Sequence, residues 1–94
     1  MGWFVGCGAA EVPPPATDQD FAFIQEREAT IDRNAGPAAG SDCDAACPAQ
    51  RALCEAAQEI CIIADDTADL DVIERCRDAD RTCRQGRSCA CDGP

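Results

Sequence analysis

The sequence predicts an all-α fold. Two antiparallel helices form a hairpin cross-linked by disulfide bonds, and a short third helix near the N-terminus is a candidate addition. Eight of the nine cysteines lie between residues 43 and 91, at Cys43, Cys47, Cys54, Cys61, Cys76, Cys83, Cys89 and Cys91. Their commonest interval is seven residues, which is two turns of an α-helix. Cys61 and Cys76, and likewise Cys54 and Cys83, are mirrored about the bond between Ala68 and Asp69, as facing partners in an antiparallel hairpin require.

The composition limits both the compartment and the partners. A chain of 94 residues forms one small domain, whose core is marginal without covalent staples. Nine cysteines in that length are typical of a disulfide scaffold in an oxidising compartment. The chain has no lysine and a net charge of −10, so it is acidic and lacks the cationic surface that nucleic acids and anionic lipids attract.

Residues 1–20 are predicted to be a truncated signal segment with a lipobox, followed by a proline-rich linker. The apolar run that ends at Cys7 is shorter than a complete signal peptide, which favours a translation start upstream of Met1 or a shortened segment. The tetrapeptide 4–7, FVGC, resembles the lipobox of bacterial lipoproteins, with Phe4 where leucine is usual. The resemblance implies that Cys7 carries diacylglycerol and becomes the mature N-terminus. Removing Cys7 leaves an even number of cysteines; the alternative is a free or intermolecular thiol at this position.

Residues 21–34 show the periodicity of a short helix, with Phe21, Ile24 and Ile31 on one face and Glu28 interrupting it. We expect this helix to dock on the hairpin, and a partly ordered acidic linker is the competing interpretation. Gly36 and its neighbours should end the helix, so residues 35–42 are predicted to be a loop.

The hairpin is assigned to residues 43–91, with helices at about 45–64 and 70–85. Ser41 or Asp44 can cap the first helix, and Pro48 suits its first turn. The acidic segment 65–69 is the predicted turn, and Gly86 is the expected residue after the second helix.

The seven-residue spacing excludes disulfides within one helix, because two turns span about 10.5 Å and bonded Cα atoms lie within about 6.8 Å. Each cysteine must therefore pair across the hairpin. The mirrored positions predict Cys61–Cys76 and Cys54–Cys83, with Ala57, Ala64 and Ala79 allowing close approach between the layers. For the outer pairs the nested order favours Cys47–Cys89 and Cys43–Cys91, and the crossed pairs Cys47–Cys91 and Cys43–Cys89 remain an alternative.

The residue types argue against an enzyme and suggest no cofactor. The absence of histidine removes the usual nucleophile–base pairs and the commonest metal ligand. The carboxylates Asp65, Asp66, Asp69 and Asp71 lack the glycine and glutamate positions of a calcium-binding EF-hand, so turn formation explains them. Thiolate binding of copper or zinc is the alternative function, since residues 43 and 47 have a suitable spacing and 89 and 91 are a second close pair. A redox role for Cys89 and Cys91 is a third hypothesis.

The predicted hairpin resembles the twin-cysteine hairpins of the CHCH class, although six residues rather than nine separate its cysteines. It more closely resembles small, uncharacterised cysteine-rich lipoproteins of Gram-negative bacteria. That resemblance implies a non-enzymatic structural or protein-interaction module, tethered to the membrane through Cys7 in the outer membrane or periplasm, or secreted. Its expected partner is an unidentified envelope protein, and no binding to nucleic acid is expected. Gly8, where an aspartate would retain an enteric lipoprotein in the inner membrane, is compatible with outer-membrane sorting.

Overall fold

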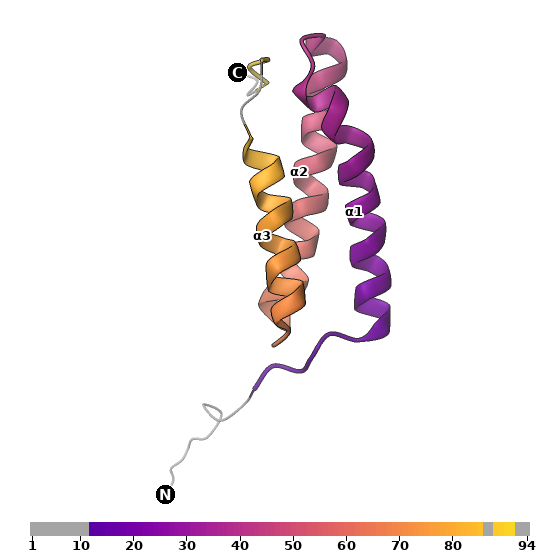
Figure 1. Cartoon of the computed structure of the whole chain (residues 1–94), viewed down its shortest axis with the longest axis vertical. Coiled ribbons are helices and arrows are strands. Elements are labelled where there is room, and N and C mark those ends of the chain that lie inside the picture. The colour runs from indigo at the N-terminus through magenta and orange to yellow at the C-terminus, as the bar shows by residue number, and fades with distance from the viewer. Residues whose placement is uncertain (1–11, 86–87, 92–94) are drawn as a thin grey trace, which may run out of the picture.

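A computed structural model describes residues 12–85 and 88–91, and this part of the chain contains three helices and no strand. The helices are α1 (Asp18–Ala39), α2 (Cys43–Asp66) and α3 (Leu70–Arg84). They run side by side in alternating directions, up, down and up in Figure 1. Both α1 and α3 pack along α2 and have few direct contacts with each other. The predicted all-α fold with a disulfide-linked hairpin is confirmed, and the N-terminal segment adds a full third helix.

The start of α1 is stabilised by a reciprocal pair of hydrogen bonds. Thr17 Oγ1 accepts from the backbone N–H of Asp20, and Asp20 Oδ2 accepts from the backbone N–H of Thr17, both at 3.0 Å. This capping box satisfies two of the N–H groups that a helix start leaves unpaired. The preceding segment is also held in place, because the N–H of Ala68 donates to the carbonyl of Pro14 at 2.9 Å.

The helix predicted at 21–34 extends over 22 residues, and the loop predicted at 35–42 shrinks to three residues, 40–42. Pro37 lies within the last turn of α1, where its missing N–H removes one hydrogen bond near the helix end. Ala38 beyond it is 4% exposed and packs in the core. The carbonyl of Ala38 also accepts from Gln50 Nε2 of α2 at 3.4 Å. Contact with α2 thus favours continuing the helix past the residues expected to stop it.

The second helix is longer than predicted, and the third matches its predicted span closely. Asp42 is the N-cap of α2 and makes no side-chain capping bond, so neither Ser41 nor Asp44 has the predicted capping role. Asp69 caps α3, its Oδ1 accepting from the N–H groups of Asp71 at 3.1 Å and Val72 at 3.4 Å. The turn between the helices is therefore Thr67 to Asp69, at the mirror point of the cysteines. The predicted role of Gly86 lies outside the described residues.

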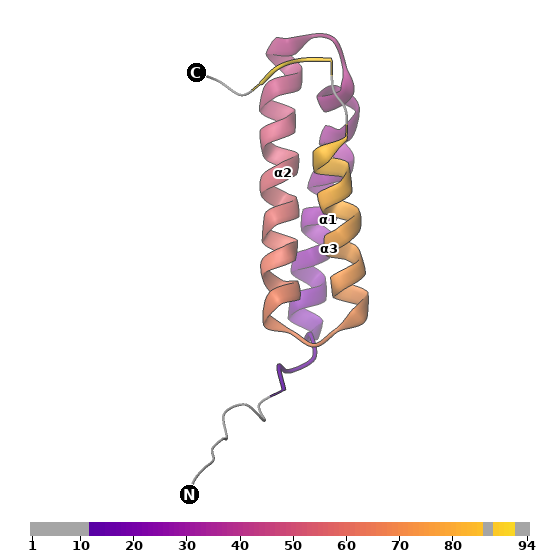
Figure 2. The same cartoon turned by 90° about the vertical axis from the view of Figure 1, so that its left-hand side faces the viewer.

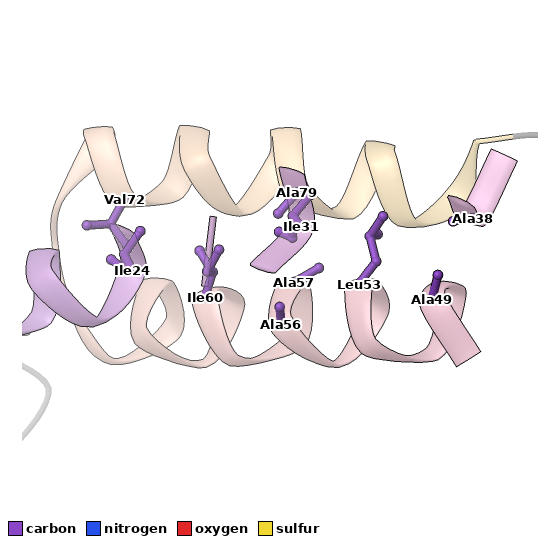
Figure 3. Packing of buried hydrophobic residues seen from close by; sticks show 10 residues of the cluster. All are labelled: Ile24, Ile31, Ala38, Ala49, Leu53, Ala56, Ala57, Ile60, Val72 and Ala79. Atoms are coloured by element: carbon purple, nitrogen blue, oxygen red, sulfur yellow. The ribbon is translucent and has the colours of Figure 1, made fainter. Parts of the chain in front are cut away.

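The core is a narrow column of aliphatic side chains between the three helices (Figure 3). Ten buried residues form it: Ile24, Ile31 and Ala38 of α1, Ala49, Leu53, Ala56, Ala57 and Ile60 of α2, and Val72 and Ala79 of α3. On α1 and α3 these residues recur every seven positions, the same repeat as the cysteines. Five of the ten are alanines, which is consistent with helices that approach closely enough for cystine to link them.

Candidate functional site

The inner two disulfides join α2 to α3 as the mirrored positions predict. Cys61 is bonded to Cys76 and Cys54 to Cys83, with Cα separations of 4.7 and 4.9 Å. Ala57 and Ala79, the small residues expected between these layers, are 3% and 6% exposed. The seam between α2 and α3 therefore alternates cystine with alanine, and both helices are held in register by covalent bonds.

The outer two disulfides differ from the nested pairs that the sequence favoured. Cys43 is bonded to Cys89 and Cys47 to Cys91, so the predicted pairs Cys47–Cys89 and Cys43–Cys91 are wrong and the crossed alternative is observed. Nested pairing requires two antiparallel segments, whereas residues 88–91 cross the N-terminal end of α2 (Figure 2).

The position of the tail explains which sulfur atoms meet. Cys89 lies level with the connection between α1 and α2, its Sγ 3.8 Å from the carbonyl oxygen of Gly40, and there it meets Cys43 at the start of α2. Two residues further along the tail, Cys91 meets Cys47, which lies one turn further into α2 than Cys43.

An ion pair connects α1 to α3. Arg75 Nη1 of α3 donates to Glu28 Oε1 at 3.0 Å, and its Nε donates to Asp71 Oδ1 at 3.4 Å. The same guanidinium lies over the ring of Phe21, 5.5 Å from its centroid. Glu28, which interrupts the apolar face of α1, therefore has a specific partner. A shallow cleft of about 280 Å³ lies beside this pair, between α1 and α3.

An exposed apolar patch lies across α1 and α2, near the end where the linker enters. Phe23 is 37% exposed and Ile62 is 53% exposed, and with Ile63 and Glu59 they line a depression of about 340 Å³. Arg27 borders the patch: its guanidinium lies 4.8 Å from the ring centroid of Phe23 and pairs with Glu59 at 3.1 Å. We call the four residues that line the depression the Phe23 patch: Phe23, Glu59, Ile62 and Ile63. Phe23 and Ile62 are thus large apolar side chains on neighbouring helices that remain partly open to solvent.

Sequence reasoning missed the Phe23 patch because it followed only the buried face of the first helix. Phe23 lies off the face of Ile24 and Ile31, and Ile62 lies off the face of Leu53 and Ile60. Large apolar residues outside the core-facing positions of two neighbouring helices were the available signal.

Other candidate sites find less support in the described part of the chain. No group of three or more acidic, histidine or cysteine side chains there is placed to hold a metal ion while the cysteines are paired. The carboxylates of 65, 66, 69 and 71 flank the turn between α2 and α3, where Asp69 is a helix cap. None of the helices in residues 12–85 has the length and hydropathy needed to cross a bilayer. Cys7, the predicted lipid-attachment residue, lies outside the described residues.

Comparison with protein-family models, with curated protein sequences and with solved structures finds no match to this chain. Four disulfides in one small helical domain indicate a protein of an oxidising environment, extracytoplasmic or secreted.

Proposed function

We propose that this chain is a non-enzymatic lipoprotein of the bacterial cell envelope, anchored through Cys7, whose helical domain is a structural or protein-interaction module. The supporting observation is the cysteine pairing. The eight cysteines of the described part form four disulfides, and these pairs leave Cys7 for separate chemistry. A lipid on Cys7 accounts for both the odd number of cysteines and the FVGC tetrapeptide.

The geometry of the domain suits such an anchor. The segment 12–17 enters the bundle at the end that carries the turn between α2 and α3, where Ala68 bonds to Pro14 (Figure 1). A lipid-anchored N-terminus would hold that end towards the membrane. The helix α2 has 24 residues and is about 36 Å long, so the outer disulfides would lie at the far end.

The Phe23 patch is the surface through which we expect a partner protein to bind. It combines two exposed large apolar side chains with the Arg27–Glu59 ion pair at its border. This combination of an apolar centre and a charged rim is typical of protein interfaces. The patch lies near the linker end of the domain, so a partner would bind close to the membrane.

Mass spectrometry of the mature protein tests the lipid anchor. The natural reading frame, with any codons upstream of Met1, is expressed in a Gram-negative host with a C-terminal affinity tag. We expect a membrane-bound protein whose N-terminal residue is Cys7 carrying diacylglycerol. The matched control is Cys7→Ser, which should stay unprocessed and unlipidated while keeping four disulfides. A wild-type protein with no lipid on Cys7 would refute the anchor.

A crosslinking experiment tests the interaction module separately. A photo-crosslinking amino acid at position 62 should capture one defined envelope protein. The Phe23→Ser variant should weaken the binding that leads to this capture about thirtyfold or more, since interface hot spots cost at least 2 kcal/mol. The control position is Leu70, which is 81% exposed but lies on α3, outside the patch. Equal capture from both positions would refute a role for the patch.

A further inference from the structure

Four cysteines gather at the N-terminal end of α2. Cys43 and Cys47 are one turn apart on this helix, and disulfides bring Cys89 and Cys91 to them with Cα separations of 5.5 and 5.3 Å. Side chains four positions apart on a helix have Cβ atoms about 5–6 Å apart. The outer cysteines therefore form two adjacent pairs at one end of the bundle, and we call them the outer four.

The inner cysteines have a different arrangement. Cys54 and Cys61 are two turns apart on α2, about 10.5 Å along the axis. Their sulfur atoms cannot bind one ion while α2 remains helical. Each inner layer offers two sulfur atoms, whereas the outer end offers four.

We propose that, when the two outer disulfides are reduced, the outer four bind one zinc ion as a tetrathiolate site. Structural zinc sites are tetrahedral with Zn–S distances of about 2.3 Å, so the sulfur atoms in them lie about 3.8 Å apart. Cα separations of 5.3 and 5.5 Å allow this spacing through side-chain rotation. Cystine and zinc thiolate are then alternative states of the same end of the bundle.

The local electrostatics favour a divalent ion. Cys43 is the first residue of α2, after the N-cap Asp42, and the positive end of the helix dipole stabilises thiolate there. The exposed carboxylates of Asp42 and Asp44 adjoin the outer four and disfavour additional negative charge. Four thiolates with Zn²⁺ carry a formal charge of −2, less than the −3 that they would carry with a monovalent ion such as Cu⁺.

The chemistry balances with a dithiol as the reductant. Each outer disulfide takes up two electrons and two protons and yields two thiols, while each dithiol becomes a cyclic disulfide. Zinc then displaces four thiol protons as four Zn–S bonds form, with no change in its oxidation state. Cys43 is exposed, whereas the four inner cysteines are half-buried, so exchange at Cys43 offers an entry point for the dithiol.

The first experiment uses the full chain with Cys7→Ser, which removes the ninth thiol. Graded reduction with dithiothreitol gives a four-thiol species, and alkylation with peptide mapping locates its thiols. Titration with Zn²⁺ or Cd²⁺ should show one ion per chain, about four protons released at neutral pH and four sulfur neighbours by X-ray absorption. The matched control adds Cys43→Ser and Cys89→Ser, which leaves only Cys47 and Cys91 at this end. The affinity of this control for zinc should be lower by about 100-fold or more, because half of the ligands are gone.

A second comparison decides the proposal whichever disulfides open first. Two fully reduced chains, both with Cys7→Ser, keep equal numbers of cysteines. One retains the outer four and has serine at 54, 61, 76 and 83; the other retains the inner four and has serine at 43, 47, 89 and 91. Zinc should bind the first chain with four sulfur neighbours and increase its helical circular dichroism. It should bind the second chain more weakly and without such an increase, because the inner cysteines cannot share one ion once α2 is helical. Equal affinity and equal helix gain in the two chains, or fewer than four sulfur neighbours in the first, would overturn the proposal.

Discussion

Arg75 and Glu28 form an ion pair at 3.0 Å between Nη1 and Oε1, although 47 residues separate them in the chain. The pair joins α3 to α1, two helices that otherwise have few direct contacts. Both side chains are about one-third exposed, and the guanidinium also lies over Phe21. Through this ion pair Glu28, the charged residue on the apolar face of α1, helps to position α1 against α3.

We expect the Glu28–Arg75 pair to stabilise the fold by about 1 kcal/mol, near the upper end for partly exposed ion pairs. A double-mutant cycle with Glu28→Gln and Arg75→Gln measures this coupling from urea unfolding of the oxidised protein. The control cycle uses Asp78→Asn and Arg81→Gln, an exposed pair within α3 with exposed fractions of 72% and 69%. Its coupling should be less than half as large; equal couplings would show that the α1–α3 contact has no special role.

Burial predicts very different costs for two neighbouring isoleucines of α2. Ile60 is fully buried in the core, so Ile60→Ala should lower the free energy of unfolding by about 2–5 kcal/mol through lost contacts and a cavity. Ile62 is 53% exposed, so Ile62→Ala should cost less than about 1 kcal/mol. Chemical denaturation of the oxidised variants provides both values. Similar costs would contradict the assigned core.

The continuation of α1 past residue 34 can be tested at its glycines. Gly36 is within the helix and a Cβ there would meet nothing within 4 Å, so Gly36→Ala should stabilise the protein by about 0.5–1 kcal/mol. Gly40 caps the helix, and its added Cβ would lie 3.3 Å from the carbonyl oxygen of Pro37, so Gly40→Ala should gain less. Thermal unfolding monitored by circular dichroism ranks the two. Destabilisation by Gly36→Ala would indicate that the helix ends earlier.

The inner disulfides should be essential for stability because the aliphatic core is small. Replacing Cys61 and Cys76 together with alanine reopens a 15-residue loop and should cost about 3 kcal/mol on chain-entropy grounds. Complete reduction should abolish most of the helical circular dichroism. The control is the oxidised form of the reductant at the same concentration. A helical spectrum that survives full reduction would mean that core packing suffices without the staples.

The hairpin was readable from the residues because its determinants are local and periodic. Seven-residue cysteine spacing forbids pairing within a helix, and mirrored positions leave Cys61–Cys76 and Cys54–Cys83 as the facing partners. The caps and acidic residues around Asp69 independently place the turn at the mirror point. The lipid anchor at Cys7 and the envelope function stay predictions, since they concern residues and partners beyond the described domain.

Three further features depend on contacts between segments far apart in the chain. The extension of α1 through Pro37 follows from packing against α2, which outweighs the local tendency of glycine and proline to end a helix. The crossed outer disulfides follow from the path of the tail over α2, where the antiparallel symmetry of the hairpin no longer applies. The Phe23 patch exists because α1 lies beside α2 and brings two exposed apolar residues together. Spacing rules describe residues within regular elements, whereas these three outcomes depend on where one element lies against another.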